Sequence, residues 1–156
     1  MVFACFGNHL VVCGAAKVVL SAAVASAYAT FPLRSNALGF SGAERAEVLS
    51  AYPLLYLAML FPAGVVCDRA EQARRALGVG LLGLAISISA FGYSTALATL
   101  SLMRGAQGLA SCAADVSSAA LVASVAGSRL AYMEGVLESC EALGWILGPP
   151  IGQEGL

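Results

Sequence analysis

Residues 135–152 read GVLESCEALGWILGPPIG, an apolar stretch of helix length in which glycines recur at fixed intervals. The spacing is G-x8-G-x3-G-P-x2-G, and its members are Gly135, Gly144, Gly148, Pro149 and Gly152. Glycines about four residues apart lie on one helix face and let a neighbouring backbone come close. Pro149 removes a backbone donor and bends the helix. We therefore expect a membrane helix that packs tightly against a neighbour and can still shift.

The composition places the chain in a membrane. Of its 156 residues, 60% are hydrophobic and only 11% are charged, and the mean hydropathy is +0.85. Soluble domains are about 45–50% apolar and about 25% charged. The formal net charge is −1 and the eight Lys and Arg residues are scattered, so a nucleic-acid partner is excluded. We expect no cofactor and no metal site.

Five apolar segments are long enough to cross a bilayer, which takes about 20 residues. The predicted helices span residues 10–31, 47–66, 76–93, 96–126 and 130–153. Two charged or polar loops are predicted between the first three helices, at residues 32–46 and 67–75. The predicted fold class is all-α, a polytopic membrane protein whose residues 1–156 form a single transmembrane domain.

The loop arginines predict the orientation. On one side of the membrane we expect Arg69, Arg74, Arg75 and Arg129, and on the other Arg34 and Arg45. An excess of Lys and Arg marks the cytoplasmic side, so the N-terminus is predicted to be cytoplasmic, in a vesicular or a plasma membrane. Residues 27–29 resemble a signal-peptide cleavage site. Because Lys17 interrupts the apolar run and no Lys or Arg precedes it, we expect the first helix to be retained.

A second pattern lies at the predicted loop after the second helix, where Gly64 is followed by Asp68-Arg69 and then by Arg74-Arg75. Gly64 would allow close helix approach. Asp68 can cap a helix end or pair with an arginine across an interface, and such pairs latch one conformation and break in another. The alternative is an ordinary cytoplasmic loop rich in arginine.

The fourth helix carries a third pattern, RGAQG at residues 104–108, which includes Arg104, Gln107 and Gly108. A buried arginine costs about 2.5–3.5 kcal/mol on insertion scales, so Arg104 needs a partner, unless its side chain extends to the membrane surface. Steps of three and four residues place a polar stripe on one face: Arg104, Gly108, Ser111, Asp115 and Ser118. Arg104 and Asp115 are about 16 Å apart along the axis, so we expect them to line one cavity without pairing. Asp115 is either a proton carrier or the acceptor of a structural hydrogen bond.

Charged residues also occur inside the other apolar segments. The fifth helix carries Glu134, Glu138 and Glu141, and the first carries Lys17. Either Glu138 or Glu141 can balance Lys17 in a structural pair, or can hold a proton or a cation. Because the deep carboxylates outnumber the deep cations, the cavity favours cationic substrates.

The three patterns, in this order, resemble motifs of the major facilitator superfamily. Residues 64–75 are similar to its loop motif G-x-x-x-D-R-x-G-R-R, although Glu71 replaces a glycine and the arginine pair comes two residues late. Residues 104–108 resemble its R-x-x-Q-G motif, and the glycine-proline pattern resembles its fifth-helix antiporter motif. Residues 137–152 also resemble the vesicular amine and polyamine transporter branch, with Gln153 in place of a final glycine, and drug:proton antiporters share the same motifs.

The resemblance implies a fold of two six-helix bundles with the substrate site between them. This chain would supply five helices of the first bundle, and its partners would be the missing C-terminal half, the bilayer, protons and a small organic cation. The implied function is proton-coupled antiport by alternating access, with Arg104 in proton coupling and Glu138 at the glutamate of the amine branch. The alternatives are a truncated or degenerate membrane protein that assembles with other helices, or an intramembrane enzyme. Because the sequence lacks HExxH and GxSxG, no enzyme is expected.

Overall fold

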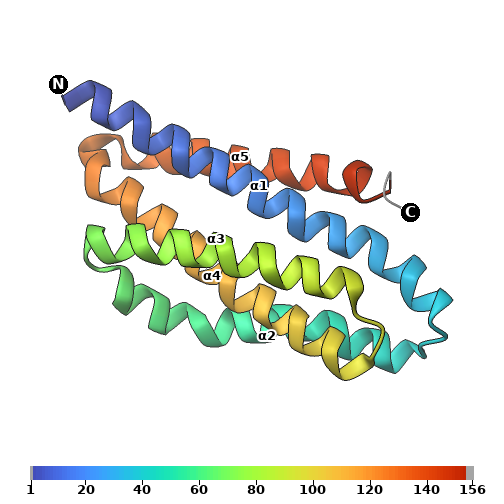
Figure 1. The fold of residues 1–156 in the computed structure, drawn as a ribbon. Coiled ribbons are helices and arrows are strands. Elements are labelled where there is room, and N and C mark those ends of the chain that lie inside the picture. The colour runs from blue at the N-terminus through green and yellow to red at the C-terminus, as the bar shows by residue number, and fades with distance from the viewer. Residues whose placement is uncertain (1, 154–156) are drawn as a thin grey trace.

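The computed structural model describes residues 2–153, and the side chains of residues 9–152. In this part of the chain every element is helical (Figure 1). The elements are α1 (Val2–Ala37), α2 (Gly42–Cys67), α3 (Ala70–Tyr93), α4 (Leu97–Ala126), the short 3-10 helix η1 (Gly127–Arg129) and α5 (Leu130–Gln153). The prediction of an all-α chain is confirmed for the described residues.

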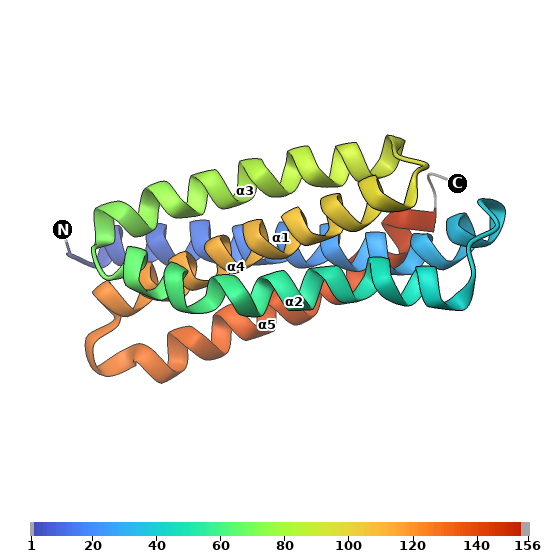
Figure 2. The ribbon, with the colours of Figure 1, turned by 90° about the horizontal axis from the view of Figure 1, so that it is seen from below.

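Successive helices run in opposite directions, so α1 begins and α5 ends at opposite ends of the bundle (Figures 1 and 2). Helix α1 packs mainly on α5, and α4 packs mainly on α2 and α3. Helices α1 and α4 also contact each other in the middle of the bundle. Residues of α1, α2, α4 and α5 can therefore face one common interior space.

Both predicted loops are shorter in the structure than expected. Helix α1 continues through Pro32 to Ala37, and α2 already begins at Gly42, so the expected loop at residues 32–46 is wrong over most of its length. The early start of α2 has a local cause, because Ser41 and Glu44 form a capping box. The Glu44 backbone N–H donates to Ser41 Oγ at 3.4 Å, and the Ser41 backbone N–H donates to Glu44 Oε2 at 2.7 Å.

The expected loop at residues 67–75 is also wrong over most of its length, because α3 begins at Ala70. Only Asp68 and Arg69 separate α2 from α3. The first turns of α3 extend the helix beyond its apolar segment, and an exposed ion pair spans them, with 2.5 Å between Arg75 Nη2 and Glu71 Oε1. Pairs at this spacing favour helix in polar segments.

Four described segments are long and apolar enough to cross a membrane: His9–Ala37, Gly42–Cys67, Ala70–Tyr93 and Leu97–Gly152. The last has 56 residues, because α4, η1 and α5 follow one another without a break in helical structure. Gly127, with a φ of +51°, lies where the chain reverses, and α5 runs back antiparallel to α4 (Figure 1). The expectation of five spans is thus matched by five α-helices but by only four candidate segments.

Three glycines of α5 lie directly against α1. A Cβ atom placed on Gly144 would lie 2.5 Å from the carbonyl oxygen of Val18. One on Gly148 would lie 2.6 Å from the carbonyl oxygen of Ala22, and one on Gly152 would be 2.8 Å from its nearest neighbour. These separations leave no room for a side chain, so the expected close approach of two backbones is present.

Two other glycines do not have the contacts that the sequence suggested. A Cβ atom on Gly135 or on Gly64 would meet no described atom within 4 Å. Gly135 precedes Gly144 by nine residues, about two and a half helical turns, so it lies on the opposite face of α5. Gly64 borders an open groove between α2, α4 and α5. The expectation of close helix approach at these two positions is therefore wrong within this chain.

Candidate functional site

A cavity of about 350 Å³ lies between α1, α2, α4 and α5. Its wall combines apolar, aromatic and acidic side chains: Leu20, Ser21, Val24, Tyr52, Pro53, Tyr56, Leu57, Asp115, Glu141 and Trp145. The volume is within the range of small-molecule sites, which are about 300–1,000 Å³ and mostly apolar with a few polar groups. The cavity is therefore the candidate site.

Two carboxylates of the cavity share one lysine. Lys17 Nζ lies 2.7 Å from Asp115 Oδ1 and 2.8 Å from Glu141 Oε2. The side chain of Lys17 is 9% exposed, that of Asp115 13% and that of Glu141 32%. Tyr56 donates a hydrogen bond from its hydroxyl to Asp115 Oδ2 at 3.1 Å. We call Lys17, Tyr56, Asp115 and Glu141 the lysine cluster.

The charges of the lysine cluster do not cancel. Two carboxylates and one ammonium give a formal charge of −1. Buried charges are tolerated only when they are paired and hydrogen-bonded. One lysine neutralises only one of the two carboxylates. The cluster can therefore accept one more proton or one more cation.

The structure decides which glutamate pairs with Lys17. Glu141 makes the contact, whereas Glu138 lies exposed on α5. Glu134 is half-buried and lines the open groove between α2, α4 and α5. Asp115 contacts Lys17 of α1 and accepts a hydrogen bond from Tyr56 of α2. It therefore has the structural hydrogen bond that was one of the two roles expected for it.

Arg104 is fully buried and lies among aromatic rings. Its guanidinium carbon is 4.0 Å from the centroid of the Tyr28 ring, 5.2 Å from that of Tyr52 and 5.8 Å from that of Phe91. Desolvated cation–π contacts of this kind contribute about 2 kcal/mol. Because Arg104 is 0% exposed, the alternative in which its side chain extends to the membrane surface is wrong.

Arg104 also pairs with the glutamine of the same motif. Its Nη1 donates to Gln107 Oε1 at 2.5 Å, and Gln107 Nε2 donates to the carbonyl oxygen of Ser87 at 3.4 Å. The expectation that Arg104 and Asp115 line one cavity is wrong, because only Asp115 is part of the cavity wall. The ring of Tyr52 contacts the guanidinium of Arg104 and lines the cavity, so it connects the two.

The polar stripe of α4 faces the interior of the bundle, as its spacing predicted. Its members are buried or nearly buried: Arg104, Gly108, Ser111, Asp115 and Ser118. Gly108 packs directly against the backbone of α2, since a Cβ atom there would overlap the carbonyl oxygen of Tyr52. This close approach brings the two α2 tyrosines of the cavity, Tyr52 and Tyr56, next to Asp115.

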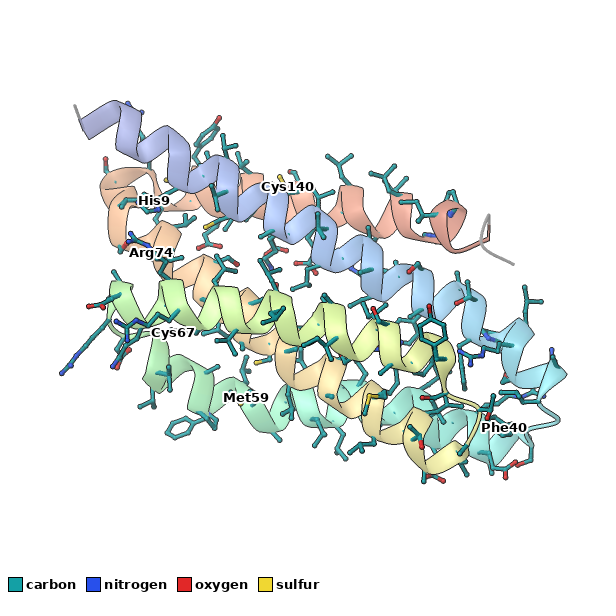
Figure 3. All side chains as sticks on the ribbon, in the orientation of Figure 1. His9, Phe40, Met59, Cys67, Arg74 and Cys140 are labelled. Carbon is teal, nitrogen blue, oxygen red and sulfur yellow. The ribbon has the colours of Figure 1, made fainter. Side chains whose placement is uncertain are left out.

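The residues of the loop motif lie at one end of the bundle, where Cys67 and Arg74 lie, opposite the end with Phe40 (Figure 3). Asp68 is exposed at the C-cap of α2, and Arg69 is exposed at the N-cap of α3. Asp68 makes no ion pair with a described residue. The contacts that would form a latch are thus absent from the part of the chain that the structure describes.

Sequence reasoning missed several groups of the site, namely Ser21, Tyr28, Tyr52, Tyr56, Phe91 and Trp145. A signal was present for Ser21, Tyr52, Tyr56 and Trp145, because each is four residues from another residue of the lysine cluster or of the cavity wall. Ser21 follows Lys17, Tyr56 follows Tyr52 and Trp145 follows Glu141 by this step. Residues four apart share a helix face, so a charged residue identifies its helix neighbours as candidates.

A comparison with known families agrees with the motifs. Residues 13–153 match the Major Facilitator Superfamily. None of the curated proteins and none of the solved structures compared with the chain matches it. The match covers the loop motif, the Arg104 motif and the glycine-proline pattern, and the described apolar helices can span a membrane. The chain is an integral, multi-pass membrane protein and belongs to the Major Facilitator Superfamily, whose members are transporters and not enzymes.

Proposed function

We propose that this chain is part of a secondary active transporter that exchanges organic cations for protons by alternating access. One observation carries the proposal: two carboxylates and three aromatic rings line the same cavity. The carboxylates belong to Asp115 and Glu141, and the rings to Tyr52, Tyr56 and Trp145.

The chemistry of this wall suits an organic cation. Carboxylates in a site of low dielectric constant attract a positive charge far more strongly than they do in water. The faces of tyrosine and tryptophan rings also attract cations, and they bury the apolar body of an organic cation. A neutral molecule of the same shape gains only the second contribution, so the site should discriminate by charge.

Exchange follows if a proton and a cation compete for the same carboxylates. The lysine cluster has a formal charge of −1, which either one neutralises. A site that binds one or the other, but not both, couples the release of the proton to the binding of the cation. Arg104 supplies a fixed positive charge behind Tyr52, and we propose that it adjusts this competition through the tyrosine ring.

The other motifs receive roles in the conformational change. We propose that Gly144, Gly148 and Pro149 let α5 bend against α1, and that Asp68 and its neighbouring arginines contact parts of the transporter outside this chain. Helices α1 to α5 would form most of an N-terminal six-helix bundle, with α4 and α5 crossing the membrane separately. The end of the bundle that carries Arg69, Arg74, Arg75 and Arg129 would face the cytoplasm.

Trp145 offers a direct test, because it is the one tryptophan of the sequence and it lines the cavity. The 156-residue chain in detergent is titrated with benzylamine and with benzyl alcohol, its neutral analogue, while tryptophan fluorescence is recorded. We expect benzylamine to bind at least about tenfold more tightly, which corresponds to about 1.4 kcal/mol. D115N should remove this preference, and E71Q, far from the cavity, should keep it.

Equal responses to both compounds would refute a cation site. The variant E138Q separates the residue favoured by family resemblance from the one favoured by geometry. We expect E141Q to weaken benzylamine binding and E138Q to leave it unchanged, because Glu138 lies outside the cavity.

A second candidate is a membrane protein that binds cations but does not transport them. The altered loop motif favours it, because Glu71 stands at a glycine position and pairs with Arg75. Vesicles that contain the chain are tested for uptake of benzyltrimethylammonium, whose permanent charge keeps it from crossing lipid, with the lumen acidic. Gradient-dependent uptake would exclude this candidate.

A further inference from the structure

We propose that Lys17 sets the charge of the substrate at +1. In the empty site the ammonium of Lys17 bridges Asp115 and Glu141, and a singly charged organic cation takes Glu141 while Lys17 keeps Asp115. The inference rests on the proposed function and adds a substrate class to it, monocations rather than polyamines.

Lys17 lies outside the wall of the cavity. Both carboxylates that it contacts line the cavity, but Lys17 is not part of the wall. The ammonium therefore approaches the carboxylates from behind, and a ligand in the cavity meets them from the other side. Lys17 and a ligand can occupy the site at the same time.

The two carboxylates differ in their contacts and in their exposure, and Glu141 is the one that Lys17 releases. Asp115 forms an ion pair with Lys17 through Oδ1 and accepts a hydrogen bond from Tyr56 at Oδ2, and its side chain is 13% exposed. Among the described residues Glu141 has one ion-pair contact, with Lys17 at Oε2, and its side chain is 32% exposed. Its neighbour one turn along α5 is Trp145. Glu141 is thus the carboxylate that a ligand reaches first and that loses fewer contacts on exchange.

The cavity wall holds a polar group that has no hydrogen-bond partner among the described residues. Ser21 Oγ is buried and makes no hydrogen bond to any described residue, although Ser21 is 2% exposed and lines the cavity. Buried hydroxyls are nearly always hydrogen-bonded, so Ser21 Oγ is a candidate acceptor for an N–H donor of a ligand. Ser21 lies one turn from Lys17 on α1, which places the acceptor beside the carboxylates.

The charge balance then gives the specificity. With one bound monocation the cluster has two positive and two negative charges and is neutral. A dication would leave an excess positive charge in a site of low dielectric constant, which is unfavourable. Lys17 therefore acts as a permanent occupant of one of two cation positions, and its flexible stem lets it shift from two carboxylates to one.

The test compares benzyl alcohol, benzylamine and m-xylylenediamine, which have the same ring and zero, one or two ammonium groups. Binding to the full chain is followed by Trp145 fluorescence. In the natural sequence we expect benzylamine to bind more tightly than benzyl alcohol. We expect the diamine to bind no more tightly than benzylamine. In K17M two carboxylates are open, and we expect the diamine to bind at least about tenfold more tightly than benzylamine.

A charge-matched variant guards against loss of folding in K17M. The double variant K17M/E141Q removes one positive and one negative charge, so its cluster keeps the formal charge of −1. It should prefer benzylamine as the natural sequence does, and K17R should do the same. Helical circular dichroism and a single elution peak in detergent confirm that each variant is folded.

The outcomes separate this inference from the proposed function. If K17M and the natural sequence prefer the same compound, the role of Lys17 is refuted while the cation site stands. If neither ammonium compound binds better than benzyl alcohol in any variant, the proposed function itself fails. If K17M does not fold, a preference of K17M/E141Q for the diamine would refute the inference.

Discussion

The contact between α1 and α5 should depend on the absence of a side chain at Gly148. A Cβ atom there would lie 2.5 Å from Ala25 Cβ, 2.6 Å from the carbonyl oxygen of Ala22 and 2.9 Å from the backbone nitrogen of Ser26. Two of these three atoms are backbone atoms, which cannot rotate away. The change G148A therefore forces the two helices apart.

The magnitude follows from two opposing contributions. Overpacking of a tight contact costs about 1–3 kcal/mol. Alanine favours helix over glycine by about 0.8–1.0 kcal/mol in water, which offsets part of that cost. We expect G148A to lower the free energy of unfolding by up to about 2 kcal/mol. It should also weaken the pair between Lys17 and Glu141, since this pair joins the same two helices.

Gly135 provides a matched control on the same helix, because a Cβ atom there would meet no described atom within 4 Å. G135A should leave stability unchanged or raise it by up to about 1 kcal/mol. The free energy of unfolding is measured by titration with sodium dodecyl sulfate in mixed micelles, with helical circular dichroism as the signal. Equal stability of G148A and G135A would refute the packing argument.

Three further changes test other contacts. G14C should form a disulfide with Cys140 on mild oxidation, because a Cβ atom on Gly14 lies 3.1 Å from Cys140 Sγ, as the place of Cys140 beside α1 suggests (Figure 3); peptide mass spectrometry detects the bond. R104K should lower the free energy of unfolding by about 1–2 kcal/mol although it keeps the charge, since a lysine loses the planar stacking on Tyr28. E71Q should change stability by less than about 0.5 kcal/mol, because its ion pair is exposed.

Each of these three has its own contrary result. Cysteine at Gly92, where a Cβ atom would meet nothing within 4 Å, should stay unpaired, and equal oxidation of both variants would contradict the α1–α5 packing. Y28L should make R104K nearly neutral if the two residues act together, and full additivity would argue against their contact. A large loss of stability in E71Q would mean that Glu71 has a structural partner other than Arg75.

Patterns within one helix were readable in the sequence because the helical period is known in advance. The spacing of Gly144, Gly148 and Gly152 predicted a smooth face, and that face lies against α1. The steps from Arg104 to Ser118 predicted one polar face, which is buried. Gly135 belongs to the same glycine pattern but lies on the opposite face of α5. The presence of a glycine in the pattern therefore did not by itself predict a contact with α1.

Local boundaries were less readable, although their causes are local. The capping box of Ser41 and Glu44 is visible as S-x-x-E, yet the polar composition of residues 32–46 suggested a loop. A polar composition indicates which residues are exposed to water. A helix continues into such a polar segment when its end is capped. The first three predicted membrane segments were therefore shorter than α1, α2 and α3, whereas the predicted segments 96–126 and 130–153 match α4 and α5 to within one residue.

The partners of the charged groups were decided only by the tertiary structure. Lys17 and Glu141 are 124 positions apart in the chain, and periodicity says nothing about which helices become neighbours or how each is rotated. The sequence predicted that a lysine and an arginine deep in apolar helices need partners, because an unpaired charge in a bilayer is costly. The packing of all five α-helices was needed to give Lys17 two carboxylates and Arg104 three aromatic rings. Both arrangements depend on the depth and rotation of helices that are distant along the chain.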